Sequence, residues 1–184
     1  MELHQTGLSF SQHPSAGHRV TAIHTPKFKT MTLAWYFERP LDDLAPVYAL
    51  GVRLMVRAFG GDDPMGINRK LQGMYGAYLQ ADTVKYGDLQ SLQIKLTFVS
   101  DHHVPHGIAE EAIGYFMTIF NEPVIEFAGF DQLVHLEKGN LISAIAQREQ
   151  DKSSHTYDSL LKALFPEKIG RASCRERVYI SVVA

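Results

Sequence analysis

The sequence predicts an α+β fold, with a mainly antiparallel mixed sheet and helices packed on one face of that sheet. Segments with strand alternation and segments with helical periodicity come in blocks: three strands, two helices, two strands and three helices. One late strand alternates apolar and polar side chains, which is typical of a strand with one face in water. The chain has 184 residues, 45% of them hydrophobic, which suits one domain with an ordinary core.

Three strands are expected before residue 41. Leu3–Ser11 and His18–Thr25 alternate polar and apolar residues around a turn at 14–17, which predicts a hairpin. Phe28–Phe37 is the strongest strand, and Pro40 ends it. Its apolar residues recur at every second position and therefore share one face: Met31, Leu33, Trp35 and Phe37.

The helix predicted at Leu44–Phe59 is the centre of the expected fold. Its apolar residues recur at helical spacing in a broad stripe, Asp43 is the expected N-cap, and Gly60-Gly61 ends it. A second helix is expected at Pro64–Tyr75, with Gly76 supplying a positive φ at its end.

Ala77–Tyr86 and Leu89–Val99 are predicted to form a second hairpin. In its second strand Leu92, Ile94, Leu96 and Phe98 alternate with Ser91, Gln93, Lys95 and Thr97, so the polar set is expected to face water. Three further helices are expected, at Gly107–Phe120, Phe130–Gln150 and Ser154–Leu164.

Composition restricts the function classes. The formal net charge is −2, which gives no basic surface for nucleic acid or membrane. The single cysteine, Cys174, excludes an internal disulfide and a cysteine–zinc site. We see no signal peptide and no apolar run long enough to span a membrane, so we expect a cytoplasmic protein with neither a nucleic-acid nor a membrane partner.

The last sixteen residues, Ile169–Ala184, closely resemble a sequencing adapter translated in one reading frame. We therefore expect one domain over 1–168 and a non-native tail over 169–184, with the natural chain continuing differently beyond Lys168.

Two groups of side chains are candidates for a site. His102, His103 and His106 lie within five residues and can in principle bind a metal, although a proline-interrupted loop favours a solvated segment. Arg53 and Arg57 are four residues apart on the central helix. They are either its solvent face or the lining of a chamber that meets peptide carbonyls or carboxylates.

Several short segments, taken in their order along the chain, resemble the N-terminal half of a pitrilysin/insulinase-family peptidase homologue, over roughly residues 3–167. Within that family the chain is similar to the YfmF-like bacterial branch, whose members are named for association with 5-aminopentanol modification of elongation factor P. The segments that carry the resemblance are Lys27-Phe28-Lys29-Thr30, Leu71-Gln72-Gly73-Met74-Tyr75-Gly76-Ala77, Tyr86-Gly87-Asp88, Phe130, Glu137-Lys138, Asp151-Lys152 and Tyr157.

The resemblance implies a zinc helix that this chain lacks. Active members carry His-x-x-Glu-His, in which two histidines bind zinc and the glutamate is the general base, with a distal glutamate as a further ligand. Aligned on Phe59-Gly60-Gly61, the motif positions are occupied by Val52, Met55 and Val56, and the distal position falls at Ala144. No catalytic residue, metal site or cofactor is therefore expected in this chain.

The resemblance then implies a non-catalytic subunit. It would pair with an active zinc-bearing homologue, and with its own missing C-terminal half, to form a peptide-processing chamber. Two alternatives remain open: a metal-dependent hydrolase that uses His102, His103 and His106, and a plain binding module without a peptidase partner.

Overall fold

The computed structural model describes residues 9–15, 18–86, 88–104, 107–122 and 128–153, together with positions 156, 159, 160 and 163. In these residues the order is three strands, two helices, two strands and two helices. Every strand pair is antiparallel, so the α+β prediction is confirmed, while the described sheets contain no parallel pair and are not mixed. The expected helix at Ser154–Leu164 and the tail at 169–184 lie mostly or wholly outside the described residues.

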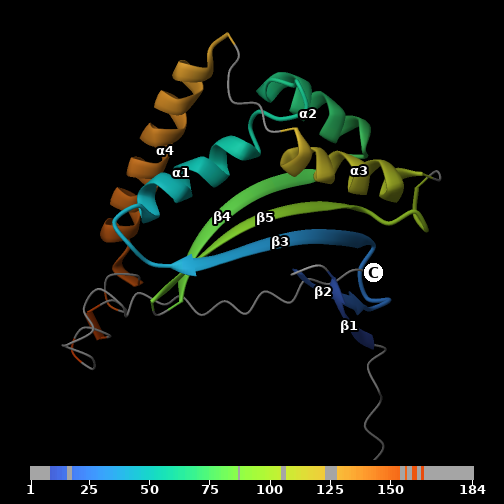
Figure 1. The fold of residues 1–184 in the computed structure, drawn as a ribbon, viewed down its shortest axis with the longest axis horizontal. Coiled ribbons are helices and arrows are strands. Elements are labelled where there is room, and N and C mark those ends of the chain that lie inside the picture. Colours follow the sequence, from blue (N-terminus) through green and yellow to red (C-terminus); the bar gives the residue numbers. More distant parts are fainter. Residues whose placement is uncertain are drawn as a thin grey trace, which may run out of the picture.

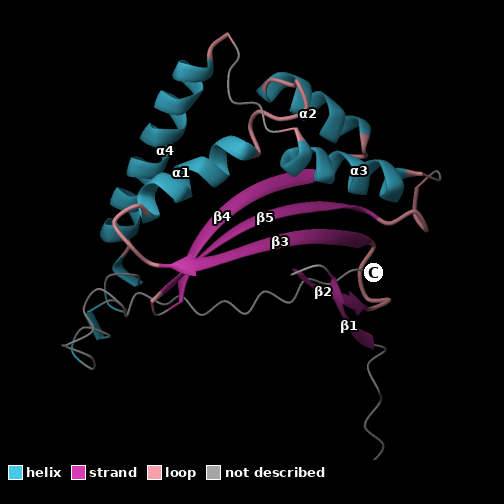
Figure 2. Ribbon diagram, in the orientation of Figure 1, coloured by secondary structure: helices cyan, strands magenta, loops and turns pink. Residues whose placement is uncertain are grey.

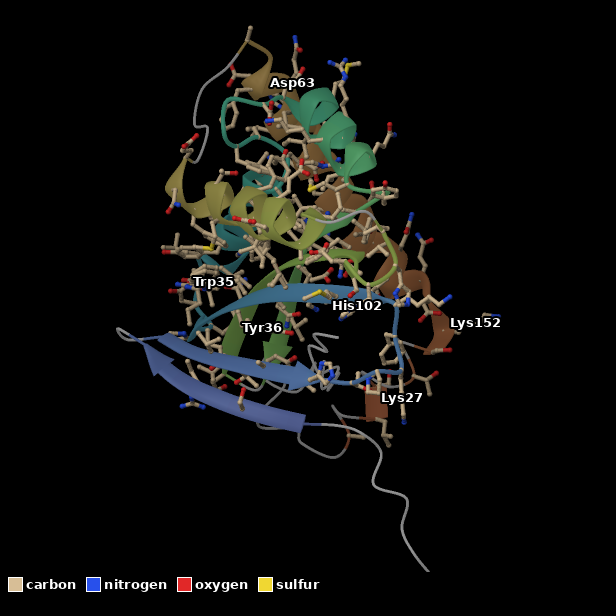
Figure 3. The ribbon with its side chains drawn as sticks, turned by 90° about the vertical axis from the view of Figure 1, so that its right-hand side faces the viewer. Lys27, Trp35, Tyr36, Asp63, His102 and Lys152 are labelled. Carbon is tan, nitrogen blue, oxygen red and sulfur yellow. The ribbon has the colours of Figure 1, made fainter. Side chains whose placement is uncertain are left out.

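The main sheet has the order β3-β5-β4, with β3 at Thr30–Pro40, β4 at Tyr78–Tyr86 and β5 at Leu89–Val99. The register pairs the apolar positions of β3 and β5, for example Leu33 with Leu96 and Trp35 with Ile94. The apolar faces predicted for β3 and β5 therefore form one continuous apolar surface. Trp35 and Tyr36, neighbours on β3, point to opposite sides of the strand (Figure 3).

The helices lie on one side of this sheet, the side of its apolar face (Figure 1). They are α1 at Ala45–Met55, α2 at Pro64–Gly73, α3 at Ile108–Asn121 and α4 at Phe130–Gln150. Helix α4 packs mainly against α1. The core between the layers is built from buried apolar side chains of β5, α1, α2, α3 and the segment after α1, including Ile94, Leu96, Phe98, Phe59 and Ile119. Within the described part of the chain, no helix has the length and apolar character that crossing a membrane requires.

The opposite face of β5 is polar but not exposed, which corrects the expectation of a wet face. Ser91, Gln93 and Lys95 are all buried. One reason is that β5 is the central strand, so β3 and β4 flank its side chains on both sides. A separate two-stranded hairpin, β1 at Ser9–Ser15 and β2 at His18–His24, lies on the side of the main sheet away from the helices (Figure 2).

Two helix starts differ in how their backbone N–H groups are satisfied. At α2 the N-cap is Asp63, whose carboxylate accepts a hydrogen bond from the Gly66 N–H at 2.8 Å (Figure 3). At α1 the N-cap is Leu44 rather than the predicted Asp43, and no side chain caps the helix there. Asp42 instead accepts a hydrogen bond from the Leu44 N–H at 2.9 Å, in the turn that precedes the helix.

The turn from α2 to β4 uses left-handed backbone conformations. Gly76 has φ +75°, as predicted, and Tyr75 before it has φ +55°. The Ala77 N–H bonds to the Leu71 carbonyl at 3.0 Å, which closes the helix end and directs the chain into β4. The turn thereby places the start of β4 beside α2.

Candidate functional site

A cavity of about 340 Å³ lies between α1, α2 and β4, with one contribution from α4. Helix α2 supplies much of one wall, and the first residues of β4 supply another. The lining residues are Arg53, Val56, Arg57, Pro64, Ile67, Asn68, Leu71, Gln72, Ala77, Tyr78, Leu79, Gln80, Ala81 and Glu137.

Helix α1 and the turn after it present Arg53, Val56 and Arg57 to the cavity. These residues are spaced three and four apart, so they share one side of the chain. The resemblance had placed the corresponding triplet one residue earlier. In the structure Val52 is 3% exposed and belongs to the core, and the partly buried Met55 packs against that core. Of the three predicted motif positions, only Val56 lines the cavity.

Glu137 of α4 completes this side of the cavity. Its carboxylate is 4% exposed and accepts a hydrogen bond from Arg57 Nε at 3.1 Å, an ion pair between residues eighty positions apart. A buried carboxylate of this kind needs such a partner, because removing either member would leave an uncompensated charge.

The structure does not bring Ala144 to the cavity. Ala144 follows Glu137 by two helical turns, on nearly the same side of α4 but about 10 Å further along the axis. It is exposed, as are all residues from Ile142 to Gln147. The residue of α4 that lines the cavity is Glu137, whereas Ala144, the distal position implied by the resemblance, does not line it.

The cavity offers few metal ligands. Its lining contains one carboxylate, already paired with Arg57, and neither imidazole nor thiol. Zinc in proteins is held by three or four such donors, so the residues present do not fit a zinc ion. Across the described residues no group of three potential ligands comes together.

The described histidines of the alternative metal-binding hypothesis lie away from the cavity. His102 and His103 are exposed in the turn after β5, near the start of β3 (Figure 3). Neither lines the cavity. His106 lies outside the described residues, so the three-histidine hypothesis stays a prediction.

The cavity opens onto the edge of the main sheet. Strand β4 pairs with β5 on one side only, and among the described strands no other strand pairs with it. Tyr78, Leu79, Gln80 and Ala81 line the cavity at this edge. An edge strand carries backbone N–H and C=O groups that can pair with an incoming extended segment.

The charges of the cavity are unbalanced. Arg57 is paired with Glu137, but Arg53 is only partly exposed and makes no hydrogen bond or ion pair with any described residue. Two guanidinium groups therefore face one carboxylate. Arg53 and Arg57 are the candidate lining residues named from the sequence, and both line this cavity. Glu137 was not predicted from the sequence, although the spacing of Leu133 and Glu137, both buried and four apart, marks the face of α4 that packs inward.

Comparison with known proteins shows the fold alone. No protein-family model matches the chain, and no curated protein matches it. It is similar to a solved structure described as the crystal structure of a conserved protein from Enterococcus faecalis V583, with a TM-score of 0.66 and 21% sequence identity. The match covers 85% of this chain and 40% of that one, so the present chain spans less than half the length of that protein.

Proposed function

We propose that this chain is a non-catalytic member of the insulinase/pitrilysin family that binds extended peptides in the cavity beside β4. In this proposal it works in the cytoplasm with an active zinc-bearing homologue, and the two together form a peptide-processing chamber. Any zinc would be held by the partner, because the lining of this cavity does not fit the metal.

The observation that carries the proposal is the juxtaposition of a cavity with an unpaired sheet edge. A peptide added along β4 would gain main-chain hydrogen bonds, and its side chains would alternate between the cavity and the outside. The cavity wall combines apolar groups, such as Ile67 and Leu71, with amides such as Asn68 and Gln72. That mixture suits a peptide better than a wholly apolar ligand.

Peptide binding is tested with fluorescein-labelled octapeptide pools and purified protein, using fluorescence anisotropy. We expect saturable binding, and we expect it to weaken when alternate backbone nitrogens of the peptides are methylated, because methylation removes the donors that pair with an edge strand. Pools methylated on only one terminal nitrogen serve as the matched control. Absence of saturable binding by any pool would refute the proposed function.

The partner is tested by mixing the chain with a homologue from the same source that carries His-x-x-Glu-His. We expect a complex in gel filtration and peptide cleavage by the mixture that exceeds cleavage by the homologue alone. Peptide binding without any such complex would favour the plain binding module. Stoichiometric zinc in the purified chain, lost on changing His102 and His103 to Ala, would favour the histidine hydrolase instead.

A further inference from the structure

Arg57 is a positioned cation rather than a free one. Its Nε atom donates to Glu137 at 3.1 Å, and the buried carboxylate anchors that end of the guanidinium. Its two terminal nitrogens donate no hydrogen bond to any described residue. A guanidinium held at Nε can still offer those N–H groups to a second acceptor.

Arg53 is the second cation of the cavity, one helical turn before Arg57. It is partly buried, and no carboxylate among the described residues pairs with it. A partly desolvated guanidinium without an anion gains more from an incoming carboxylate than a fully solvated one does. Together with the Arg57–Glu137 pair, Arg53 leaves the cavity with a surplus of one positive charge.

We propose that this cavity recognises a carboxylate group of the bound peptide, with Arg53 as its main partner and the terminal nitrogens of Arg57 as the second. The cavity has a surplus of one positive charge, which the single negative charge of a carboxylate would neutralise. A phosphate group carries more negative charge, and the fixed carboxylate of Glu137 would repel it more strongly. This inference rests on the proposed peptide binding and adds the chemical class of the ligand.

The carboxylate has two possible sources, the C-terminus of a peptide or an acidic side chain. Three octapeptide pools without Lys, Arg, Asp or Glu in their random positions distinguish them. The first pool ends in a free carboxylate, the second ends in an amide, and the third ends in an amide and carries one fixed Glu. We expect the first or the third pool to bind about tenfold or more tightly than the second, the size of one charge-assisted hydrogen-bonded contact.

The variant Arg53→Gln tests the residue. We expect it to reduce binding of the preferred carboxylate pool to the level of the neutral amide pool, and to leave binding of the amide pool unchanged. Arg69→Gln is the matched control, because Arg69 is an exposed arginine of α2 that does not line the cavity. It removes the same charge from the molecule but should leave the preference intact.

The outcomes separate this inference from the proposed function. Equal binding of all three pools, or equal effects of Arg53→Gln and Arg69→Gln, would overturn carboxylate recognition while peptide binding stood. Competition by inorganic phosphate at concentrations where acetate has no effect would also overturn it. Failure of every pool to bind would overturn both. The pool comparison uses the unaltered protein, so it does not depend on whether a variant folds.

Discussion

At the scale of single residues, Gly76 shows how one backbone angle positions the cavity. Its φ of +75° turns the chain from α2 into β4, and a Cβ built there would meet nothing within 4 Å. Gly76→Ala should therefore act through conformational strain alone and lower the free energy of unfolding by about 1–2 kcal/mol. Urea denaturation measures this. Gly51→Ala, in the middle of α1 and equally free of contacts, should instead raise it by about 0.5–1 kcal/mol.

Asp42 links the end of β3 to the start of α1. Its carboxylate accepts hydrogen bonds from Arg39 at 2.6 Å and 3.1 Å, and from the Leu44 N–H. The Arg39 bonds chiefly, and the backbone bond in addition, hold the pKa of Asp42 below its ordinary value of 3.8. NMR titration of the side-chain carboxyl should show this lowered pKa, and Arg39→Gln should move it back toward the ordinary value.

The sign of the effect on stability follows from that direction. The folded form binds the proton of Asp42 less readily than the unfolded chain, so this group stabilises the fold above the unfolded pKa. Its contribution is lost as pH falls through the lower folded pKa. Because the pair is exposed, the loss should be small. Asp42→Asn should remove it, and an unchanged acid limb of the stability profile in that variant would contradict the assignment.

At the scale of elements, the beginnings of α1 and α2 provide a matched comparison. Asp63 caps α2 through its bond to the Gly66 N–H, so Asp63→Ala should cost about 1 kcal/mol of unfolding free energy. Asp43 precedes α1 in the sequence but makes no cap bond there. Asp43→Ala should accordingly change stability little. Thermal unfolding of the two variants side by side checks the difference, and equal losses would show that Asp43 caps α1 in solution.

The elements also show which features a sequence can predict. A strand has only two faces, and the alternation of apolar and polar residues assigns each side chain to one of them. The apolar faces of β3 and β5 were therefore predicted correctly. The burial of Gln93 and Lys95 was not predicted, because it depends on β5 being central in the sheet. Alternation within a strand carries no information about its neighbours.

The site was predicted in part for a similar reason. Arg53 and Arg57 are polar positions on an otherwise apolar helix, and they stand out in the sequence. Val52 and Met55 face the core while Val56 lines the cavity, and hydrophobicity alone cannot distinguish these sides because all three residues are apolar. Glu137 was missed because its partner is eighty residues away, and only the packing of α4 on α1 brings them together.

At the scale of the whole molecule, the second half of α4 is a segment that packs little against the rest of the described fold. Ile142 and Ile145 are 57% and 54% exposed, in a stretch where every neighbour from 142 to 147 is also exposed. Exposed apolar side chains favour association. We predict that the chain self-associates in sedimentation experiments and binds a hydrophobic dye, and that Ile142→Ser with Ile145→Ser reduces both.

Ala144→Ser is the control for that prediction, since it makes the same kind of change at an exposed position between them without removing a large apolar group. A monomer in sedimentation that binds no dye would show that this segment does not need a partner surface to pack against. It would also favour the plain binding module over a subunit that packs on a partner.

The strand order β3-β5-β4 also has a consequence for folding while the protein is synthesised on the ribosome. Strand β3 acquires its only sheet neighbour among the described strands when β5 is made, because residues such as Thr30 and Val99 must pair. At synthesis rates of about 5–20 residues per second, several seconds pass between the synthesis of β3 and that of β5. Throughout that interval the β3 residues Met31, Leu33 and Trp35 have no partner strand. During that interval α1 and α2 emerge first, and they can shield this strand until its partner arrives.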